Sequence, residues 1–383
     1  MTKPPVADRK IQTEPIKWSW RVATVAGIPI YIHGTFVVLI IFLLVDGFSQ
    51  GESIRAAVSS VLFVLAIFAT IVLHELGHAL TAQRFGIRTR DITLLPIGGL
   101  ARLERMPDVP RQELWVALAG PAVNLVIAGV ALAVVLVSGE AVPRVTLESG
   151  ADGVIGRFIA VNVWLALFNL LPAFPMDGGR ALRALLAERT DYVRATEIAA
   201  TIGQGLALVF GFIGLMANPL LIFIALFVWM GASAEASFVS VRGALAGIPV
   251  SRAMITDFRA VEAESPLQHV IDLVLTGSQR DFPVLDNGVL VGVLTQDRLL
   301  AALHERGPMG TIRQAMTTTF ETVDAREMLD GAFMRLQTCN CTVMPVLYDQ
   351  RLVGLLTPEN IAEYVMIRGA LRPAGARRPG FLG

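Results

Sequence analysis

The amino-acid sequence predicts a polytopic α-helical membrane domain of about six transmembrane helices, followed by a smaller α/β domain built from two similar halves. Of the 383 residues, 54% are hydrophobic and only 17% are charged. The mean hydropathy of +0.60 is above that of ordinary soluble domains. Apolar windows long enough to cross a bilayer lie before residue 240, and the sequence after that point contains an internal repeat.

The helices are predicted from the length of their apolar windows, since a membrane span needs about 20 mainly apolar residues. Such windows cover residues 28–45, 57–80, 114–137 and 155–171, and residues 198–238 are long enough for two more. Ala217-Asn218-Pro219 predicts a tight turn between the last two. The polar N-terminal stretch lacks the pattern of a cleavable signal peptide, so we expect the first helix to act as the targeting signal.

Basic residues predict how this domain is oriented. Two connections carry a single arginine, Arg55 in the first loop and Arg144 in the third. The alternate connections are rich in basic residues: Lys3, Arg9, Lys10, Lys17 and Arg21, then Arg84, Arg88, Arg90, Arg102, Arg105 and Arg111, then Arg180, Arg183, Arg189 and Arg194. Because basic connections stay on the cytoplasmic side, we expect a multi-pass cell-membrane protein with both termini cytoplasmic. A formal net charge of zero suggests no nucleic-acid partner.

The C-terminal domain contains a duplication. Residues 282–300 and 344–362 align at a constant offset of 62 residues. The offset pairs Pro283 with Pro345, Gly292 with Gly354, and Thr295 with Thr357. Each copy reads as strand, turn, strand and helix, with a further helix before it. The predicted boundaries are a tail at 1–26, the membrane domain at 27–240, two α/β copies at 241–305 and 306–370, and a tail at 371–383.

The segment His74-Glu75-Leu76-Gly77-His78 is an HExxH pattern on the second predicted membrane helix. Histidines at positions i and i+4 lie one turn apart on one face, so both imidazoles can bind a single zinc ion while Glu75 activates water. Two histidines and a glutamate inside an apolar helix are costly unless they have partners. The pattern therefore predicts a catalytic zinc site.

A catalytic zinc needs a third protein ligand and an open position. His269 and His304 belong to the duplicated region, so Asp177 in NLLPAFPMDGGR is the better candidate. Asp177 follows the fourth span at its cytoplasmic end, and HELGH lies at the cytoplasmic end of the second, so both groups fall at a similar depth. The alternative is that Asp177 merely caps a helix that starts at Gly178.

Other polar groups are candidates for substrate positioning. Asn169 can donate a hydrogen bond to a developing oxyanion, and helix packing is an equally good explanation for Asn169 and for Asn124. His33 lies near the predicted zinc depth, where it has either a role in the site or an interfacial role. Pro172 and Pro175 break the fourth span and leave backbone groups that can pair with an extended substrate.

These motifs resemble the site-2 protease family of intramembrane metalloproteases, peptidase family M50. The resemblance rests on HELGH and on an N-x-x-P-x-x-x-x-D-G segment at 169–178, and GPAVN at 120–124 and PIGGLARLE at 96–104 extend it over most of residues 20–240. It implies one Zn²⁺ held by His74, His78 and Asp177, with Glu75 as general base, toward the cytoplasmic side. We recognise no PDZ domain, which many members carry.

The resemblance also implies the substrates of regulated intramembrane proteolysis, which are single-span membrane proteins such as anti-sigma factors or signal-peptide remnants. Two other functions stay open. A membrane transporter of metal or another solute would distribute polar groups along several spans, whereas here they lie at one depth. A non-catalytic membrane scaffold would not require Glu75.

The duplicated region resembles a tandem pair of CBS domains, a Bateman module. In such pairs a threonine and an acidic residue meet the phosphate and ribose of an adenine nucleotide. The corresponding residues are Thr295 and Asp297 in the first copy and Thr357 and Glu359 in the second, where aspartate is usual. The resemblance implies ATP, ADP or AMP as a regulatory ligand, or else a ligand-free scaffold, and a homodimer formed through CBS pairs. We expect Cys339 and Cys341 to be reduced cysteines.

Overall fold

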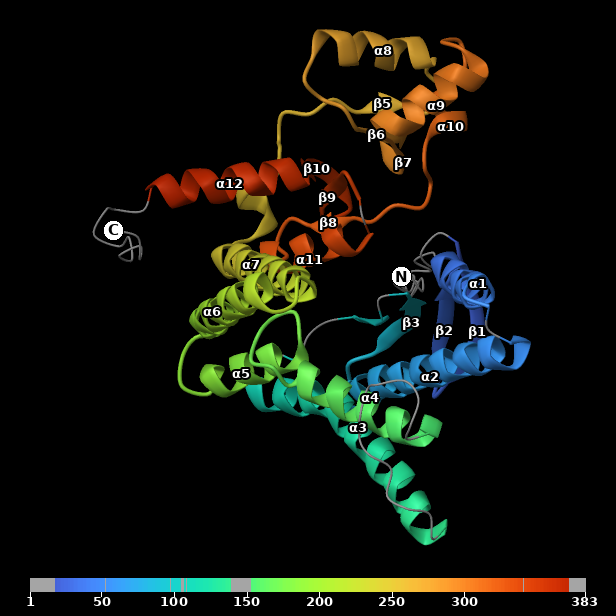
Figure 1. Cartoon of the computed structure of the whole chain (residues 1–383). Helices are drawn as coiled ribbons and strands as arrows, with labels where there is room; N and C mark the ends of the chain where they lie inside the picture. Colours follow the sequence, from blue (N-terminus) through green and yellow to red (C-terminus); the bar gives the residue numbers. More distant parts are fainter. Residues whose placement is uncertain are drawn as a thin grey trace. The chain divides into compact units, whose positions relative to one another are not determined.

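A computed structural model describes residues 18–51, 53–96, 98–104, 107, 109–138, 153–339 and 341–371. The chain divides into two compact units, Met1–Ser237 and Phe238–Gly383. Figure 1 labels most of the helices and strands of both. Arg144 and most of the two predicted tails lie outside the described residues.

Unit 1 is mainly helical. Four of its helices are long and apolar enough to cross a membrane: α2 (Ile54–Arg84), α3 (Pro110–Ser138), α6 (Tyr192–Met216) and α7 (Leu220–Leu245). Two more, α1 (Gly34–Ser49) and α4 (Gly153–Asn169), are apolar but shorter. The predicted turn at residues 217–219 separates α6 from α7.

The first predicted span begins too early, because residues 28–33 form a strand. Four strands, β1 (Ser19–Val25), β2 (Ile28–His33), β3 (Thr89–Leu95) and β4 (Gly98–Leu103), make a sheet in the order β1-β2-β3-β4. The β2–β3 pair is parallel and the outer pairs are antiparallel. The apolar window concealed β2, whose Ile28 and Ile30 are buried and alternate with less buried residues. Among the described residues, β4 is an edge strand.

The sheet packs on the part of α2 that carries HELGH. Ile28 and Ile92 from the sheet share a core cluster with Leu76 and Ala79 of α2. The contact is close at β4, where a Cβ added to Gly99 would lie 2.7 Å from Cγ of Glu75. The edge strand therefore runs directly beside the predicted catalytic base.

A short helix, α5 (Asp177–Ala187), follows α4 through a buried loop. Ala173 and Met176 of this loop pack with Ala207 of α6 and Val228 of α7. Phe174 of the loop belongs to a second buried cluster, with Ala199 and Ala200 of α6 and Ala232 of α7. The loop that leads to Asp177 is thus held in place by α6 and α7.

Unit 2 contains two copies of a strand, helix, strand, strand and helix unit. The repeat predicts the helix, strand, strand and helix of each copy, and the short first strand was not predicted. The first consists of β5 (Val261–Glu262), α8 (Leu267–Thr276), β6 (Phe282–Asp286), β7 (Val289–Leu294) and α9 (Gln296–Arg306). A short helix, α10 (Ile312–Ala315), leads to the second copy: β8 (Val323–Asp324), α11 (Leu329–Cys339), β9 (Met344–Tyr348), β10 (Arg351–Leu356) and α12 (Pro358–Leu371). A 3-10 turn (Val250–Arg252) precedes the first copy.

The two copies exchange backbone bridges in a symmetric way. Ile255, which precedes the first copy, pairs with Leu355 of the second. Thr317, which precedes the second copy, pairs with Val293 of the first. Val293 and Leu355 then share a buried cluster with Val343. Each copy therefore completes its sheet with the segment before the other, which ties the pair into one body.

The two cysteines differ from the sequence expectation. Cys339 and Cys341 are joined by a disulfide, with their Cα atoms 5.1 Å apart. This separation lies within the usual range for a disulfide. A C-x-C spacing at the end of α11 brings the two side chains within reach of one another.

Candidate metal centre

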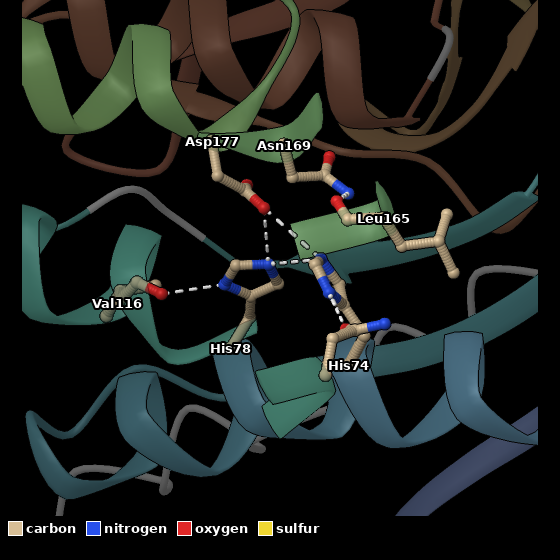
Figure 2. Close-up of polar contacts among 7 residues, drawn as sticks. His74, His78, Val116, Leu165, Asn169 and Asp177 are labelled. Carbon is tan, nitrogen blue, oxygen red and sulfur yellow. Dashed lines mark hydrogen bonds and ion pairs between the residues drawn. The ribbon is translucent and has the colours of Figure 1, made fainter. Parts of the chain in front are cut away.

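Two histidines of α2 and an aspartate about a hundred residues later, at the start of α5, converge on one point, as Figure 2 shows. Nε2 of His74 lies 3.1 Å from Nε2 of His78. Oδ2 of Asp177 lies 3.2 Å from the first nitrogen and 3.1 Å from the second. All three residues are buried, with no more than 8% of their surface exposed. They form the candidate metal-binding group in the described part of the chain.

The hydrogen bonds of the two Nδ1 atoms show which ring nitrogens are available to a metal. Nδ1 of His78 lies 2.6 Å from the carbonyl oxygen of Val116, which only accepts hydrogen bonds. Nδ1 of His74 lies 2.7 Å from Oδ1 of Asn124. Both Nδ1 atoms therefore carry the proton in the neutral rings, and both Nε2 lone pairs face the carboxylate of Asp177.

This donor set fits zinc. Three lone-pair donors within 3.2 Å of one another repel unless a cation lies among them. Tetrahedral ligands about 2.0–2.1 Å from zinc lie roughly 3.3 Å apart, close to the separations observed. His74, His78 and Asp177 would hold the ion, and the remaining tetrahedral position would be open to water.

A chain of amides orients His74. Nδ2 of Asn162 donates to the carbonyl oxygen of Phe158 over 2.9 Å, so Oδ1 of Asn162 must be an acceptor. Nδ2 of Asn124 donates to that oxygen over 3.3 Å, which leaves Oδ1 of Asn124 to accept from His74. The sequence analysis missed Asn162, because one asparagine in an apolar helix gives no pattern of its own.

Close approach of α3 to the histidines requires a glycine. A Cβ added to Gly120 would lie 2.2 Å from Nε2 of His78 and 2.6 Å from Nε2 of His74. A side chain at this position would occupy the space where the ligand atoms meet. The GPAVN segment therefore contributes both a space-making residue, Gly120, and a histidine partner, Asn124.

Asp177 is the first residue of α5, and its carboxylate faces the histidines rather than capping the helix. The N-cap residue is Met176, which makes no side-chain cap hydrogen bond. The following Gly178 is packed so tightly that an added Cβ would lie 2.3 Å from the carbonyl oxygens of Leu170 and Leu171. The DGG sequence thus fixes how α5 starts and where the carboxylate points.

The other positioning candidates have separate roles. Nδ2 of Asn169 donates to the carbonyl oxygen of Leu165 in its own helix over 2.9 Å (Figure 2). His33 caps α1, where its ring accepts from the backbone of Thr35, and it is not among the three converging residues. Of the three candidates, Asn124 is the one that hydrogen-bonds a ligand residue.

The loop before Asp177 pairs part of its own backbone, so fewer of its groups are open to a substrate than its prolines suggest. The amide of Ala173 bonds the carbonyl of Leu171 over 2.7 Å, and the amide of Met176 bonds the carbonyl of Ala173 over 3.0 Å. Ala173, Phe174 and Met176 are buried under α6 and α7. An edge is available instead on β4.

A small cavity of about 40 Å³ lies beside the metal ligands. Its lining comes from four elements and one loop residue: Glu75 and His78 of α2, Ala101 and Leu103 of β4, Glu113, Val116 and Ala117 of α3, Arg180 of α5, and Pro107. This volume suits one or two waters or a single carbonyl group. Glu75 therefore faces a confined space next to the candidate metal-binding group.

A buried ion cluster holds α5 against its neighbours. Arg183 has 0% of its surface exposed, and its Nε donates to Oε1 of Glu113 of α3 over 2.8 Å. It also pairs with Glu235 of α7, and its guanidinium lies 4.9 Å from the ring of Tyr192. The sequence analysis counted Arg183 as a loop charge, since the helix α5 was too short to recognise.

The four predicted nucleotide residues of unit 2 line one cavity of about 560 Å³. Thr295 and Thr357 are also helix N-caps, accepting from backbone amides over 3.4 Å and 3.2 Å. Asp297 and Glu359 lie in the first turns of the same helices, α9 and α12. The lining also includes residues absent from the prediction, among them Asp257, Phe258, Arg280, Asp281 and Glu363.

A buried His-His-Asp group beside a glutamate, carried by helices suited to a membrane, defines a membrane metallohydrolase joined to a separate α/β module. Comparison with known families gives matches to the Peptidase family M50 model over residues 62–145 and 141–210 and to the CBS domain model over residues 250–305. A zinc metalloprotease of Methanocaldococcus jannaschii is 34% identical over 319 residues, which cover 82% of this chain and 88% of that protein.

Two solved structures are also similar. The site-2 protease from Methanocaldococcus jannaschii is 38% identical, covers 57% of this chain and 95% of its own, and gives a TM-score of 0.41. A structure of CBSX2 in complex with AMP is 23% identical, covers 32% of this chain and 99% of its own, and gives a TM-score of 0.30. The chain belongs to peptidase family M50: it is a membrane zinc metalloprotease with a CBS module. Both resemblances seen in the sequence are thereby confirmed.

Proposed function

We propose that the chain is an intramembrane endopeptidase that cuts the transmembrane segment of single-span membrane proteins. The observation that carries this proposal is the convergence of His74, His78 and Asp177 next to Glu75 on an apolar helix long enough to span a bilayer. A hydrolytic centre built into such a helix meets peptide bonds of other membrane segments. Anti-sigma factors and signal-peptide remnants are the client classes we infer.

Glu75 acts as the general base in this proposal. It lines the small cavity beside the ligands, where it accepts a proton from the attacking water and delivers that proton to the leaving amine. Zinc, when bound, supplies Lewis-acid activation of the water and of the scissile carbonyl. Asn124 and Val116 keep the two histidine rings turned with Nε2 toward Asp177.

The substrate binds as an added strand on β4. A peptide bond inside a helix is shielded by its own hydrogen bonds, so the segment to be cut must first become extended. The outer edge of β4 has unpaired backbone groups among the described strands, and Ala101 and Leu103 of β4 line the cavity with Glu75. Strand addition would pair those groups and bring the substrate backbone to the catalytic base.

The topology we propose has six spans, with α1 and α4 completing the four long helices. A span that is shorter than the bilayer is accommodated when the bilayer thins locally or when flanking side chains extend to the membrane surface. The alternation of basic connections supports cytoplasmic termini, a cytoplasmic CBS module and a site toward the cytoplasmic side. We assign 27–240 to the protease domain, and 241–305 and 306–370 to the two CBS domains.

The CBS module is a regulatory site for an adenine nucleotide in this proposal. Thr295, Asp297, Thr357 and Glu359 line a cavity of about 560 Å³, within the usual size range for a small-ligand pocket. The lining has five carboxylates and one arginine, Arg280. This excess of negative charge repels phosphate groups, so AMP should bind more tightly than ADP or ATP free of magnesium. We also propose that two modules pair in a homodimer.

The protease assignment is tested by comparing wild type with Glu75→Gln in membranes that contain a single-span anti-sigma factor. We expect the wild type to cleave within the transmembrane segment. Glu75→Gln should bind zinc and retain the substrate without cutting it, because the amide cannot accept the proton. Equal processing by both proteins would refute the proposal.

A further inference from the structure

Two arginines one turn apart on α5 are used in different ways. Arg183 is buried among Glu113, Glu235 and two aromatic rings. Arg180 makes no hydrogen bond or ion pair with any residue that the structure describes, yet it lines the small cavity with Glu75 and His78. The presence of an arginine at position 180 is therefore not explained by the packing of α5.

The same cavity contains a buried acceptor without a partner. Oε1 of Glu113 accepts from Arg183 and from Tyr192, but Oε2 of Glu113 is buried and has no hydrogen-bond partner. Buried polar atoms in folded proteins are nearly always paired. The cavity is thus lined by the guanidinium of Arg180, which has no hydrogen-bond partner among the described residues, and by a buried carboxylate oxygen without a partner. These two groups match the carbonyl oxygen and the N–H that a peptide unit offers.

The charge of Arg180 acts on the reaction centre. Its guanidinium interacts electrostatically with Glu75, with Asp177 and with Glu113, which are all part of this small region. Hydrolysis of a peptide bond develops an anion on the carbonyl oxygen, and Arg180 places a positively charged donor at the cavity beside the reaction centre. A preformed donor placed beside such an anion lowers the barrier of acyl transfer.

We propose that Arg180 is a further catalytic residue, which donates hydrogen bonds to the carbonyl oxygen of the scissile peptide. When water attacks the carbonyl carbon, the C=O π-electron pair moves to oxygen and Arg180 stabilises the resulting oxyanion. Collapse re-forms the C=O bond and breaks the C–N bond, and the proton taken by Glu75 goes to the amine. This role replaces the one that sequence analysis gave to Asn169, and it rests on the proposed protease function.

The test measures kcat, KM and zinc content for the full-length detergent-solubilised protein with a single-span substrate. We expect Arg180→Met to lower kcat by about 10²–10³-fold, the loss typical of removing an oxyanion donor. KM and zinc stoichiometry should stay near the wild-type values, and Arg180→Lys should recover part of the rate. Arg189→Met, which removes an exposed arginine just after α5, is the matched control and should cleave like wild type.

A second measurement separates binding from chemistry. In a Glu75→Gln background, Arg180→Met should capture the uncleaved substrate with the same affinity as Glu75→Gln alone. The proposal is overturned if Arg180→Met keeps kcat within threefold of wild type, loses zinc, or loses capture of the substrate. Absence of cleavage by the wild type would instead refute the protease function itself, so the two failures are distinguishable.

Discussion

Gly120 shows how a residue without a side chain can decide metal binding. Its backbone passes so close to the ligands that an added Cβ would lie 2.2 Å from Nε2 of His78. Either α3 must move away or the histidine must turn. Both changes break the hydrogen bonds that the histidine rings donate to Val116 or Asn124 and that orient the rings.

We therefore expect Gly120→Ala to abolish zinc binding and proteolysis while the protein still folds, measured by zinc content after purification. Gly129→Ala in the same helix is the matched control, because an added Cβ there meets nothing within 4 Å. Zinc content equal to wild type in Gly120→Ala would contradict this account of the site.

The three proposed ligands were predictable from sequence, whereas the residues that support them were not. His74 and His78 follow from spacing on one helix, and Asp177 follows from membrane depth and from the family motif. Asn162 acts through Asn124, and Arg183 acts through contacts with α3 and α7. Such contacts between distant segments leave no periodic pattern in the chain, so they became visible only in the folded structure.

At the scale of elements, the ion cluster around Arg183 joins three helices. Glu113 comes from α3, Glu235 from α7 and the arginine from α5. Removing one member of a buried cluster leaves the others charged and unpaired in an apolar environment, which costs about 3–5 kcal/mol. Glu235 is partly exposed, so its ion pair with Arg183 contributes less to the stability of the protein than the pair with Glu113 does.

We expect Arg183→Met to lower stability by about 3–5 kcal/mol, measured by equilibrium unfolding in detergent. Glu235→Gln should cost less, because solvent reaches its carboxylate. If Arg183→Met unfolds with the same midpoint as wild type, then the cluster does not hold α5 in place.

Helices were predicted better than strands in unit 1. Long apolar windows identify α2, α3, α6 and α7, because only a helix satisfies its own backbone inside a bilayer. The sheet escaped notice because β2 is concealed within an apolar window and β3 and β4 lie in a loop rich in arginine. Pairing of β2 with β3, separated by two helices, is set by tertiary packing on α2.

At the scale of the whole molecule, α7 belongs to both units. Val228 and Ala232 pack on the loop before Asp177, whereas Val241 and Leu245 pack in the core of the second CBS copy. The boundary between the units falls inside this helix, after Ser237. The two units are therefore joined within one helix, and we propose this helix as the route by which nucleotide binding would affect cleavage.

We expect AMP binding to the full chain to change the cleavage rate, and a Gly-Gly-Ser insertion after Ser237 to remove that effect while AMP still binds. Asp297→Ala should lose both binding and regulation, and Asp286→Ala, outside the cavity lining, should retain both. Calorimetry and cleavage assays on the same preparations measure the two properties. A rate that still responds to AMP in the insertion variant would exclude α7 as the route.

The burial of the loop before Asp177 beneath α6 and α7 also concerns the order of synthesis. A ribosome produces both histidines early, but the loop that presents Asp177 has only the cover of α6 until the residues of α7, beyond 219, have been made and inserted. We expect a nascent chain that ends before α7 to hold zinc poorly and to cut nothing. The enzyme would thus remain harmless to neighbouring membrane proteins while it is being assembled.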